Sequence, residues 1–462
     1  SNSGISGATN FGIDAARGDI IALMDHDDML AKDALAQVMA AFRPQHVDLV
    51  YSDETVFNDD MDSLSFGYFG SPILKPDYSP DLLLSHNYVT HFLAVRKELI
   101  EAVGGLRSEF DGAQDYDLIL RLTELTHNIV HIAEPLYHWR QSTQSTSLDT
   151  LAKPDAHLRG KKALTEALDR RNIKGKVLTG SAPHFFRVRR EIIGNPAVDI
   201  VIPFRDQPLM LQQCIDSLLT RTSYSNFRII GVDNGSVEQL TLDLRRRYEE
   251  SSNQVKFVDL DVPFNFAQIV NYGVEQSTAD HVVLLNNDIQ IINFDWLESL
   301  LEHSQRPEMG AVGGKLYYPD DTIQHAGIVV GIGEFAGHPH KHDQGGSSGY
   351  VNRLNVIQNT SAVTGAMLMC KTAVYREVAG LNAEHFKVAC NDVDFCLRLI
   401  EQGYRNVFTP FAQAYHHESI SRGYEDTPEK KARFEREKSL FQARHSAYLT
   451  HGDPYYNKNL LL

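Results

Sequence analysis

Cysteine is scarce in this chain, and long apolar runs are missing from its sequence. The 462 residues include four cysteines, and none lies in a Cys-x-x-Cys pair. Four cysteines in so long a chain exclude a disulfide scaffold, so we expect buried free thiols. No apolar run approaches the ~20 residues that cross a bilayer, and no signal peptide is visible. The sequence therefore predicts a cytoplasmic protein.

Basic residues are also in deficit. The chain has 44 Lys and Arg against 60 Asp and Glu, which gives a formal net charge of −16. Since nucleic acids are bound through surplus Lys and Arg, we expect no nucleic-acid partner. A phosphate-bearing ligand would instead be held locally, by a metal ion or by backbone amides. The hydrophobic fraction of 42% is that of a globular chain, and ~100–200 residues per domain predicts two or three domains.

The most informative feature is an internal repeat. Residues 10–13 (Asn-Phe-Gly-Ile) return as residues 271–274 (Asn-Tyr-Gly-Val), and the same offset aligns Asp27 with Asp288. Further along, residues 114–117 resemble residues 391–394, and Tyr137-His138 resembles Tyr415-His416. The order of the matches is kept, with an insertion in the second copy. We therefore interpret the chain as two related domains in tandem.

The second copy begins with a block that the first copy lacks. This block contains a strand at 198–203, a helix from about 208 to 219 and a strand and turn at 227–236. Alternating strands and helices predict α/β domains with a mostly parallel sheet, whose ligands bind beyond the carboxyl ends of the strands. The predicted organisation is a first domain that is about two-thirds complete (1–149), a connector (150–195), a complete second domain (196–424) and a helical tail (425–462).

Acidic residues follow the apolar strands of both copies. Asp25, Asp27 and Asp28 end one such strand, and Asp288 ends its counterpart. Carboxylates at this density suit Mg²⁺ or Mn²⁺, but they also suit an acidic turn that caps the next helix. A histidine at 416 or 417 can add a nitrogen ligand.

A second acidic pattern lies at the start of a predicted helix in each copy. Asp392 and Asp394 flank Val393, and Asp115 and Asp117 flank Tyr116. These carboxylates either complement the helix dipole or act as a general base that takes a proton from a hydroxyl group. One residue of each pair can do each job.

Two further segments have open interpretations. Residues 317–350 are rich in Gly and His, and a zinc site there is disfavoured because no cysteine is near. In the tail, Phe434, Phe441 and Tyr448 form one stripe of a charged helix. The stripe predicts docking on the body of the protein, with contact to a membrane surface as the alternative.

Together these motifs resemble two tandem copies of the family 2 glycosyltransferase domain, of the rhamnosyltransferase-like type found in bacterial O-antigen and rhamnan biosynthesis. The resemblance covers nearly the whole chain. The motifs that carry it are residues 202–206, 232–236, 285–288, 364–366, 391–394 and 416–419 in the second copy, and residues 12–18, 25–28 and 114–117 in the first.

The resemblance implies a GT-A fold (Rossmann-like), with the first domain lacking its N-terminal nucleotide-binding part. It implies a nucleotide-diphosphate-sugar donor, a saccharide or lipid-linked saccharide acceptor and inversion at the anomeric carbon. The product would be a growing bacterial surface polysaccharide, made at the inner face of the cytoplasmic membrane by a peripherally associated enzyme. The implied cofactor is a divalent metal, Mn²⁺ or Mg²⁺.

The resemblance also implies roles for individual residues. Asp392 matches the catalytic base and Asp115 is its counterpart, although the Glu that precedes this Asp in the family is Asn391 here and Gln114 in the first copy. Asp288 matches the last Asp of the metal-binding DxD motif, whose first Asp is replaced by Asn286. These departures leave a non-catalytic nucleotide-sugar or carbohydrate-binding scaffold as the alternative. The implied metal ligands are Asp288, His416, His417, Asp25 and Asp27, and the implied donor-binding residues are Pro203, Phe204, Arg205, Asp233, Asn234, Gly235, Asn287 and Gly365.

Overall fold

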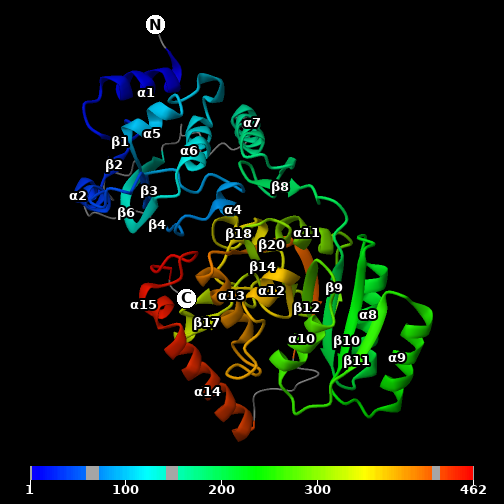
Figure 1. The fold of residues 1–462 in the computed structure, drawn as a ribbon. Helices are drawn as coiled ribbons and strands as arrows, with labels where there is room; N and C mark the ends of the chain where they lie inside the picture. Colours follow the sequence, from blue (N-terminus) through cyan, green and yellow to red (C-terminus); the bar gives the residue numbers. More distant parts are fainter. Residues whose placement is uncertain (1–2, 59–71, 142–153, 419–426, 461–462) are drawn as a thin grey trace. The chain divides into compact units, whose positions relative to one another are not determined.

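The computed structural model describes residues 3–58, 72–141, 154–418 and 427–460 (Figure 1). The chain divides into two compact units. The first unit comprises Ser1–Arg190 together with Pro454–Leu461, and the second comprises Glu191–Asp453 with the last residue. The segment predicted as a connector therefore contributes most of its residues to the first unit, up to Arg190.

The first unit is built around one mixed sheet. Its strand order is β1-β5-β3-β6-β2, with β4 beside β3. The β3/β6 pair is parallel, whereas the β1/β5, β5/β3 and β6/β2 pairs are antiparallel. The elements are α1 (Gly4–Ala15), β1 (Ile20–Leu23), β2 (Met29–Leu30), α2 (Ala34–Ala41), β3 (Leu49–Asn58), β4 (Pro72–Ile73), α4 (Pro80–Leu83), β5 (Leu93–Arg96), α5 (Lys97–Ala102), α6 (Gln114–Leu125), β6 (Ile129–Gln141), α7 (Pro154–Arg170) and the hairpin β7 (Gly175–Thr179) and β8 (Phe186–Arg190).

The second unit has a larger sheet of the order β11-β10-β9-β12-β19-β14-β20-β13. Its strands are β9 (Val198–Phe204), β10 (Phe227–Asp233), β11 (Val255–Asp259), β12 (His281–Leu285), β13 (Ile289–Ile291), β14 (Met309–Tyr317), β15 (Ile323–His325), β16 (Val329–Val330), β17 (Ala336–Gly337), β18 (Gln358–Asn359), β19 (Met367–Lys371) and β20 (Arg405–His416). Its helices are α8 (Pro208–Thr220), α9 (Gln239–Ser251), α10 (Phe266–Glu275), α11 (Trp296–Ser304), α12 (Thr372–Glu377), α13 (Asn391–Glu401), α14 (Pro428–Arg444) and α15 (Ser446–His451).

Helices cover both faces of the larger sheet. One core contains side chains of α8, α9 and α11, and the other contains side chains of α10, α12, α13 and α14. Because β12 is covered on both faces, all five of its residues are buried, and its sequence reads as an apolar run.

The predicted α/β class is confirmed, but both sheets are mixed rather than mostly parallel. The β11/β10, β10/β9, β9/β12 and β14/β20 pairs are parallel, but β19 lies antiparallel to both of its neighbours, β12 and β14. The expectation came from the alternation of strands and helices in both copies. After β14 the chain runs through residues 318–366 without an α-helix and re-enters the sheet as β19 at the same edge at which β14 ended. A parallel neighbour would need a crossover connection there.

The two sheets share one plan. The order β1-β5-β3-β6-β2 of the first unit corresponds to β12-β19-β14-β20-β13 of the second, with the same parallel and antiparallel pairs. A side-chain clamp is also repeated. Asn10 bonds the main-chain O and N of Leu106, and Asn271 bonds those of Leu381. The second unit adds β9, β10 and β11 beside β12, and the described part of the first unit has no strands in that position.

The tail helix docks on the second unit, as the stripe predicts. Phe441 is fully buried and packs against Phe335 and Phe386. The Oε2 of Glu437 accepts a hydrogen bond from the main-chain N of Ala389 at 2.7 Å, next to the start of α13.

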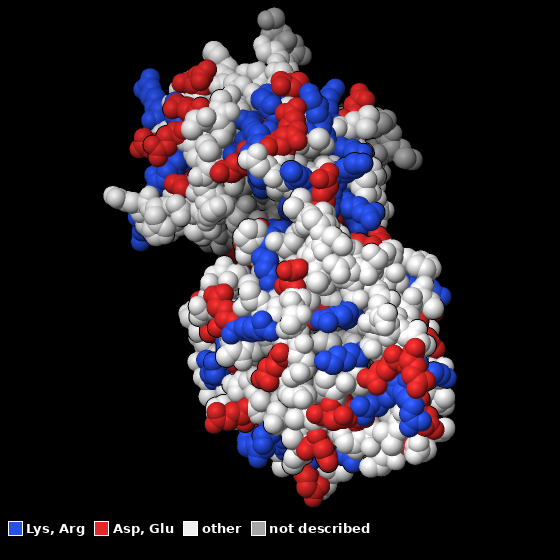
Figure 2. Space-filling model, turned by 45° about the vertical axis from the view of Figure 1, so that its right-hand side comes forward, with Lys and Arg blue, Asp and Glu red and all other residues white. Residues whose placement is uncertain are grey.

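The surface and the cysteines agree with the composition. All four cysteines are buried and free. Figure 2 shows acidic and basic side chains interspersed over the face in view. Among the described residues, no helix has the length and apolar character needed to cross a membrane.

A matched pair of glycines tests the difference between the units. A Cβ on Gly273 of α10 would lie 2.4 Å from Val201 and 2.7 Å from Val232, on β9 and β10. Its counterpart Gly12 of α1 has no described atom within 4 Å of a Cβ. We expect Gly273→Ala to lower the free energy of unfolding by about 1–3 kcal/mol through overpacking. Gly12→Ala should raise it by up to about 1 kcal/mol through helix propensity. Urea unfolding of both variants measures this, and an equal effect at the two positions would contradict the comparison.

Candidate active site

The candidate site of the second unit lies at the carboxyl ends of three parallel strands. β10, β9 and β12 are neighbours in register, so Asp233, Phe204 and the residues after Leu285 come to the same edge of the sheet. This is the edge at which open α/β sheets bind ligands.

The loop after β9 is held by its neighbour after β10. Asp206 Oδ1 accepts hydrogen bonds from the main-chain N of Val237 and Glu238, each at 2.8 Å. The ring of Phe204 is buried edge-on against Phe257, whereas Arg205 is exposed and Pro203 is half-buried. Of this loop, Arg205 and the main chain are therefore the parts available to a ligand.

The turn after β10 uses its polar side chains internally. Asp233 Oδ1 accepts from the main-chain N of Ser236 at 2.7 Å, and Oδ2 pairs with Arg245. Asn234 donates to the main-chain O of Leu260 and of Val262. Gly235 has φ +75°, where a Cβ would also lie 2.6 Å from Asp261 Oδ1, so this position requires glycine. Asp233, Asn234 and Gly235 thus shape the edge of the site.

The turn after β12 brings a carboxylate and an imidazole together. His416 Nε2, at the end of β20, lies 3.2 Å from Asp288 Oδ1, and both side chains are buried. The contact lacks the alignment of a hydrogen bond, and Asp288 Oδ1 has no hydrogen-bond partner among the described residues. The two atoms are therefore close neighbours without a hydrogen bond between them.

This arrangement fits a divalent cation. Two ligands at right angles on an ion about 2.1 Å away would be about 3 Å apart. The adjacent Oδ1 of Asn286 is also buried and unpartnered within the described structure, so it offers a further oxygen. In the described part of the chain, no three His, Cys, Asp or Glu side chains gather to hold a metal by themselves. A bound ion would therefore take its other ligands from substrate phosphates and water, as Mg²⁺ commonly does.

The structure distinguishes the two histidine candidates. The ring of His416 faces Asp288. The ring of His417 instead lies 3.4 Å from Gln290 Oε1, and its main-chain N donates to the main-chain O of Asp288. The side chain of Asn287 is buried, and its Nδ2 has no partner in the described residues.

Asp392 joins the same site through the turn at 364–366. Its Oδ2 accepts from the main-chain N of Gly365 at 2.9 Å, and the main-chain O of Ala366 accepts from the N of Asn286 at 3.1 Å. The turn therefore connects the start of α13 to the end of β12. Burial raises the pKa of Asp392 above its usual value of 3.8, although hydrogen bonds from Gly365 and Val393 oppose this.

The second aspartate of each pair is a structural anchor. Asp394 is fully buried and accepts from Arg398 Nε at 2.8 Å and His445 Nε2 at 3.0 Å, which ties the tail to α13. Burial alone would raise the pKa of Asp394, but these partners hold it below its usual value.

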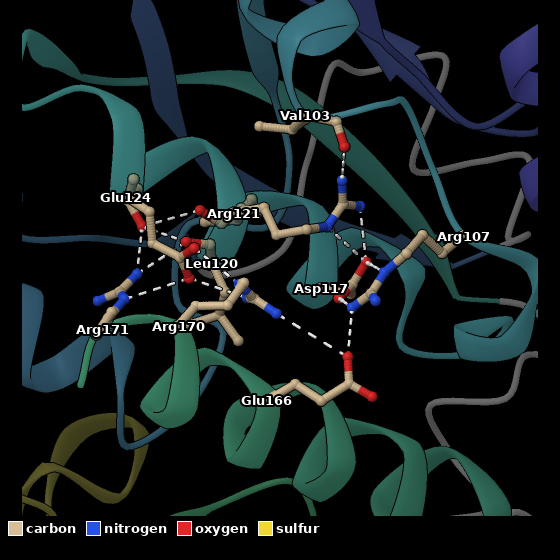
Figure 3. Close-up of polar contacts among 11 residues, drawn as sticks. Val103, Arg107, Asp117, Leu120, Arg121, Glu124, Glu166, Arg170 and Arg171 are labelled. Atoms are coloured by element: carbon tan, nitrogen blue, oxygen red, sulfur yellow. Dashed lines mark hydrogen bonds and ion pairs between the residues drawn. The ribbon is translucent and has the colours of Figure 1, made fainter. Parts of the chain in front are cut away.

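In the first unit, Asp117 occupies the corresponding position and pairs with Arg107 and Arg121 (Figure 3). Arg107 also pairs with Glu166 of α7. The arginine four residues further along the helix is thus a partner in both units (Arg121 and Arg398), whereas the other partners differ.

The acidic turn of the first unit corresponds to the turn after β12 in the second unit. The equivalent residue of the first unit lies one position later than the constant offset of the repeat predicts. Met29 pairs with His138, as Ile289 pairs with His416, so Asp28 rather than Asp27 is at the position of Asp288. Asp28 is 7% exposed, whereas the side chain of Asp27 is 49% exposed. One extra residue in this turn of the first copy causes the shift.

Asp25 and Asp115 are close enough to interact in the first unit. Burial raises the pKa of Asp25, and among its neighbours Asp28 and Asp115 add to this while His91 opposes it. Asp115 Oδ2 accepts from Asn87 Nδ2 at 2.9 Å. The acidic side chains of this turn and the first residue of the Asp pair are therefore associated here as well.

The sequence did not predict that Gln324 and Glu418 belong to the candidate site. Gln324 Nε2 lies 2.7 Å from His416 Nδ1 and 3.2 Å from Glu418 Oε2. Both belong to segments that the sequence singled out, the Gly- and His-rich segment and the motif at 416–419, but nothing in the sequence predicted the contacts of Gln324 with His416 and Glu418. The adjacent His325 and His338 are 2.9 Å apart, and burial lowers the pKa of His338 to about 4.

The sequence of the chain matches a known protein family. The profile of "Glycosyl transferase family 2" matches residues 1–104 and 199–354, together more than half of the chain. The chain therefore belongs to glycosyl transferase family 2, which confirms the expectation of a glycosyltransferase family enzyme.

Two relatives match almost the whole chain. It is 43% identical over all its length to the uncharacterized protein y4gI of Sinorhizobium fredii, of which it covers 50%. It is 40% identical over 98% of its length to the O-antigen biosynthesis protein RfbC of Myxococcus xanthus, of which it covers 35%. The chain thus spans half or less of the length of these relatives.

Among solved structures, the chain is similar to a mannosyltransferase of Pyrobaculum calidifontis in complex with GDP-Man and Mn²⁺. The TM-score is 0.40 at 16% identity, over 65% of this chain and 81% of that one.

Two neighbouring aspartates of α13 should respond oppositely to neutralisation. Asp394→Asn breaks a buried charge network, so we expect the free energy of unfolding at pH 7 to fall by about 3 kcal/mol. Asp392→Asn should leave it unchanged or raise it, because burial disfavours the charged form of Asp392. Urea unfolding measures both, and a similar loss for the two variants would contradict the division of roles.

Proposed function

We propose that the second unit is an inverting glycosyltransferase of GT-A type. It would transfer a sugar from a nucleotide-diphosphate donor to a hydroxyl group of a saccharide or lipid-linked saccharide. The observation that carries the proposal is the turn at 364–366, because both the segment 286–288 and Asp392 are hydrogen-bonded to it. This supports a single site in which Asp288 and His416 would bind a cation and Asp392, a carboxylate without an ion-pair partner among the described residues and with a raised pKa, would act as the base.

In the proposed reaction, Asp392 accepts the proton of the acceptor hydroxyl as its oxygen attacks the anomeric carbon. The bond to the nucleoside diphosphate breaks on the opposite face, so the configuration inverts and no covalent enzyme intermediate is needed. Asp288 and His416, with the oxygen of Asn286, would hold Mn²⁺ or Mg²⁺, which supplies charge stabilisation to the leaving diphosphate. The exposed Arg205 and the loops after β9 and β10 would bind the nucleotide.

The first unit would act as a partial copy of the same domain, with Asp115 and Asp28 at the positions of Asp392 and Asp288. Its described residues lack strands corresponding to β9 and β10, so donor binding is proposed for the second unit. The relative named for O-antigen biosynthesis supports a bacterial surface polysaccharide as the product. Synthesis would take place at the inner face of the cytoplasmic membrane, with the protein associated peripherally.

Turnover decides between an enzyme and a binding scaffold. The chain is incubated with Mn²⁺, a panel of nucleotide-diphosphate sugars and oligosaccharide or lipid-linked acceptors, and products are detected by mass spectrometry. We expect transfer of at least one sugar. Nucleotide binding by calorimetry without transfer to any acceptor would support the scaffold alternative instead.

Neutralising the proposed base should abolish transfer selectively. We expect Asp392→Asn to lower kcat at least about 100-fold, because a positioned general base contributes at least that much. Donor affinity should stay within a few-fold. Asp115→Asn in the first unit is the matched control and should retain the wild-type rate. Equal rates for Asp392→Asn and wild type would remove Asp392 from this role.

The pH profile provides a second test. Asp392 must be ionised to accept a proton, and its pKa is raised above 3.8, so the acid limb of kcat should lie above the pH expected for an ordinary aspartate. The rate should fall as the pH falls through that raised value. A profile that stays flat down to pH 4 would contradict the assignment.

A further inference from the structure

Gln324 contacts the ring nitrogen of His416 that does not face Asp288. Its Nε2 lies 2.7 Å from His416 Nδ1, and the side chain is 7% exposed. Its Oε1 is buried and has no hydrogen-bond partner in the described part of the chain. A buried amide oxygen without a partner is costly, so this group calls for an explanation.

A second amide lies at the other ring nitrogen. Asn286 Nδ2 is 3.3 Å from His416 Nε2, and Asn286 Oδ1 is likewise buried and unpartnered among the described residues. A neutral imidazole has one N–H and one lone pair, so it can accept from only one of the two NH₂ groups. One of the two side-chain amides must therefore flip so that its oxygen faces the ring. The oxygen of each amide has no hydrogen-bond partner among the described residues, so either amide can flip.

The choice of amide decides what His416 can do. If Asn286 turns, Nε2 carries the proton and cannot bind a cation beside Asp288. If Gln324 turns, its Oε1 accepts from Nδ1–H, and Nε2 keeps its lone pair beside Asp288 Oδ1, 3.2 Å away. Histidines that bind metals generally donate their other N–H to an acceptor in this way.

We propose that Gln324 is a positioning residue that selects the tautomer of His416, and that its amide turns its oxygen to Nδ1 when the cation binds. The inference rests on the proposed function, because it assumes a cation at Asp288 and His416. Glu418 opposes the turn: its Oε2 lies 3.2 Å from Gln324 Nε2 and holds the NH₂ group in place. The metal-free protein therefore has the proton on Nε2.

Exchange of the two side chains isolates this effect. In the double variant Gln324→Glu/Glu418→Gln, net charge and side-chain lengths are kept, but a carboxylate now accepts from Nδ1–H at all times. Gln324→Met removes the acceptor and keeps the length. Gln290→Met is the matched control, since Gln290 contacts the ring of His417. The affinity for Mn²⁺ alone is measured by calorimetry, and Asp288→Asn reports whether binding occurs at the proposed site.

We expect Gln324→Met to weaken Mn²⁺ binding about 10-fold or more, as for other residues that support a metal ligand. The exchanged variant should bind Mn²⁺ at least as tightly as wild type, and Gln290→Met should not differ from it. Wild-type affinity in Gln324→Met, or an exchanged variant as weak as Gln324→Met, would overturn the inference. If either of these results is found but Asp288→Asn still loses Mn²⁺ binding, the role of Gln324 is refuted and the proposed metal site is still supported. Absence of Mn²⁺ binding in the wild type would instead refute that site.

The tautomer itself gives a readout that does not depend on metal affinity. In metal-free protein with ¹⁵N-labelled histidine, the signals of His416 are identified by their loss in His416→Ala. Wild type should show the proton on Nε2 and the exchanged variant on Nδ1. The same tautomer in both proteins would overturn the proposed role of Gln324 even if their metal affinities differ.

Discussion

The main-chain turn at 364–366 is the interaction on which the site of the second unit depends. It is hydrogen-bonded on one side to the residue that follows β12 and on the other to the carboxylate at the start of α13. Because β12 is central and buried on both faces, the end of this strand has little freedom to move. The hydrogen bond from the turn fixes the position of the Asp392 carboxylate relative to β12. The carboxylate of Asp392 is thus held in place although burial by itself disfavours its charged form.

The Asp-x-Asp pairs show how one helix start can serve two purposes. In both units the second aspartate is fully buried and neutralised by arginines, so the helix is anchored there. The first aspartate forms no ion pair among the described residues and remains available for chemistry. In the first unit, the partners of Asp117 lie before α6 (Arg107) and on α6 itself (Arg121). In the second unit, the partners of Asp394 lie on α13 (Arg398) and in the tail (His445). The helix start has been kept while its supports differ.

The sequence was sufficient for the repeat and the acidic turns, and it singled out most of the residues that the structure groups at the candidate site, because these depend on motifs that stay local and collinear. It predicted Asp288, His416 and Asp392 in the order in which the structure groups them. It failed at Asp28, since one extra residue in a turn is invisible to a constant offset but shifts the register of the strand that follows. It also failed at β19, because the direction of a strand after a long irregular segment depends on where the chain re-enters the sheet. Gln324 carried no signal of contact with His416 or Glu418, because its strand β15 pairs with β14, and β14 in turn pairs with β20.

What the sequence determined by itself is therefore the family, the tandem repeat and the chemical types of the site residues, since these are written in residue identity and spacing. Only the tertiary structure decided which histidine faces Asp288, which aspartate of each pair is an anchor and which amides flank the His416 ring. The anchoring of Asp394 by His445 spans 51 positions. The contacts of His416 depend on distances of a few ångströms between residues more than 90 positions apart in the chain. Hydrogen bonding and ion pairing act over such distances, so they become decisive once the strands have paired.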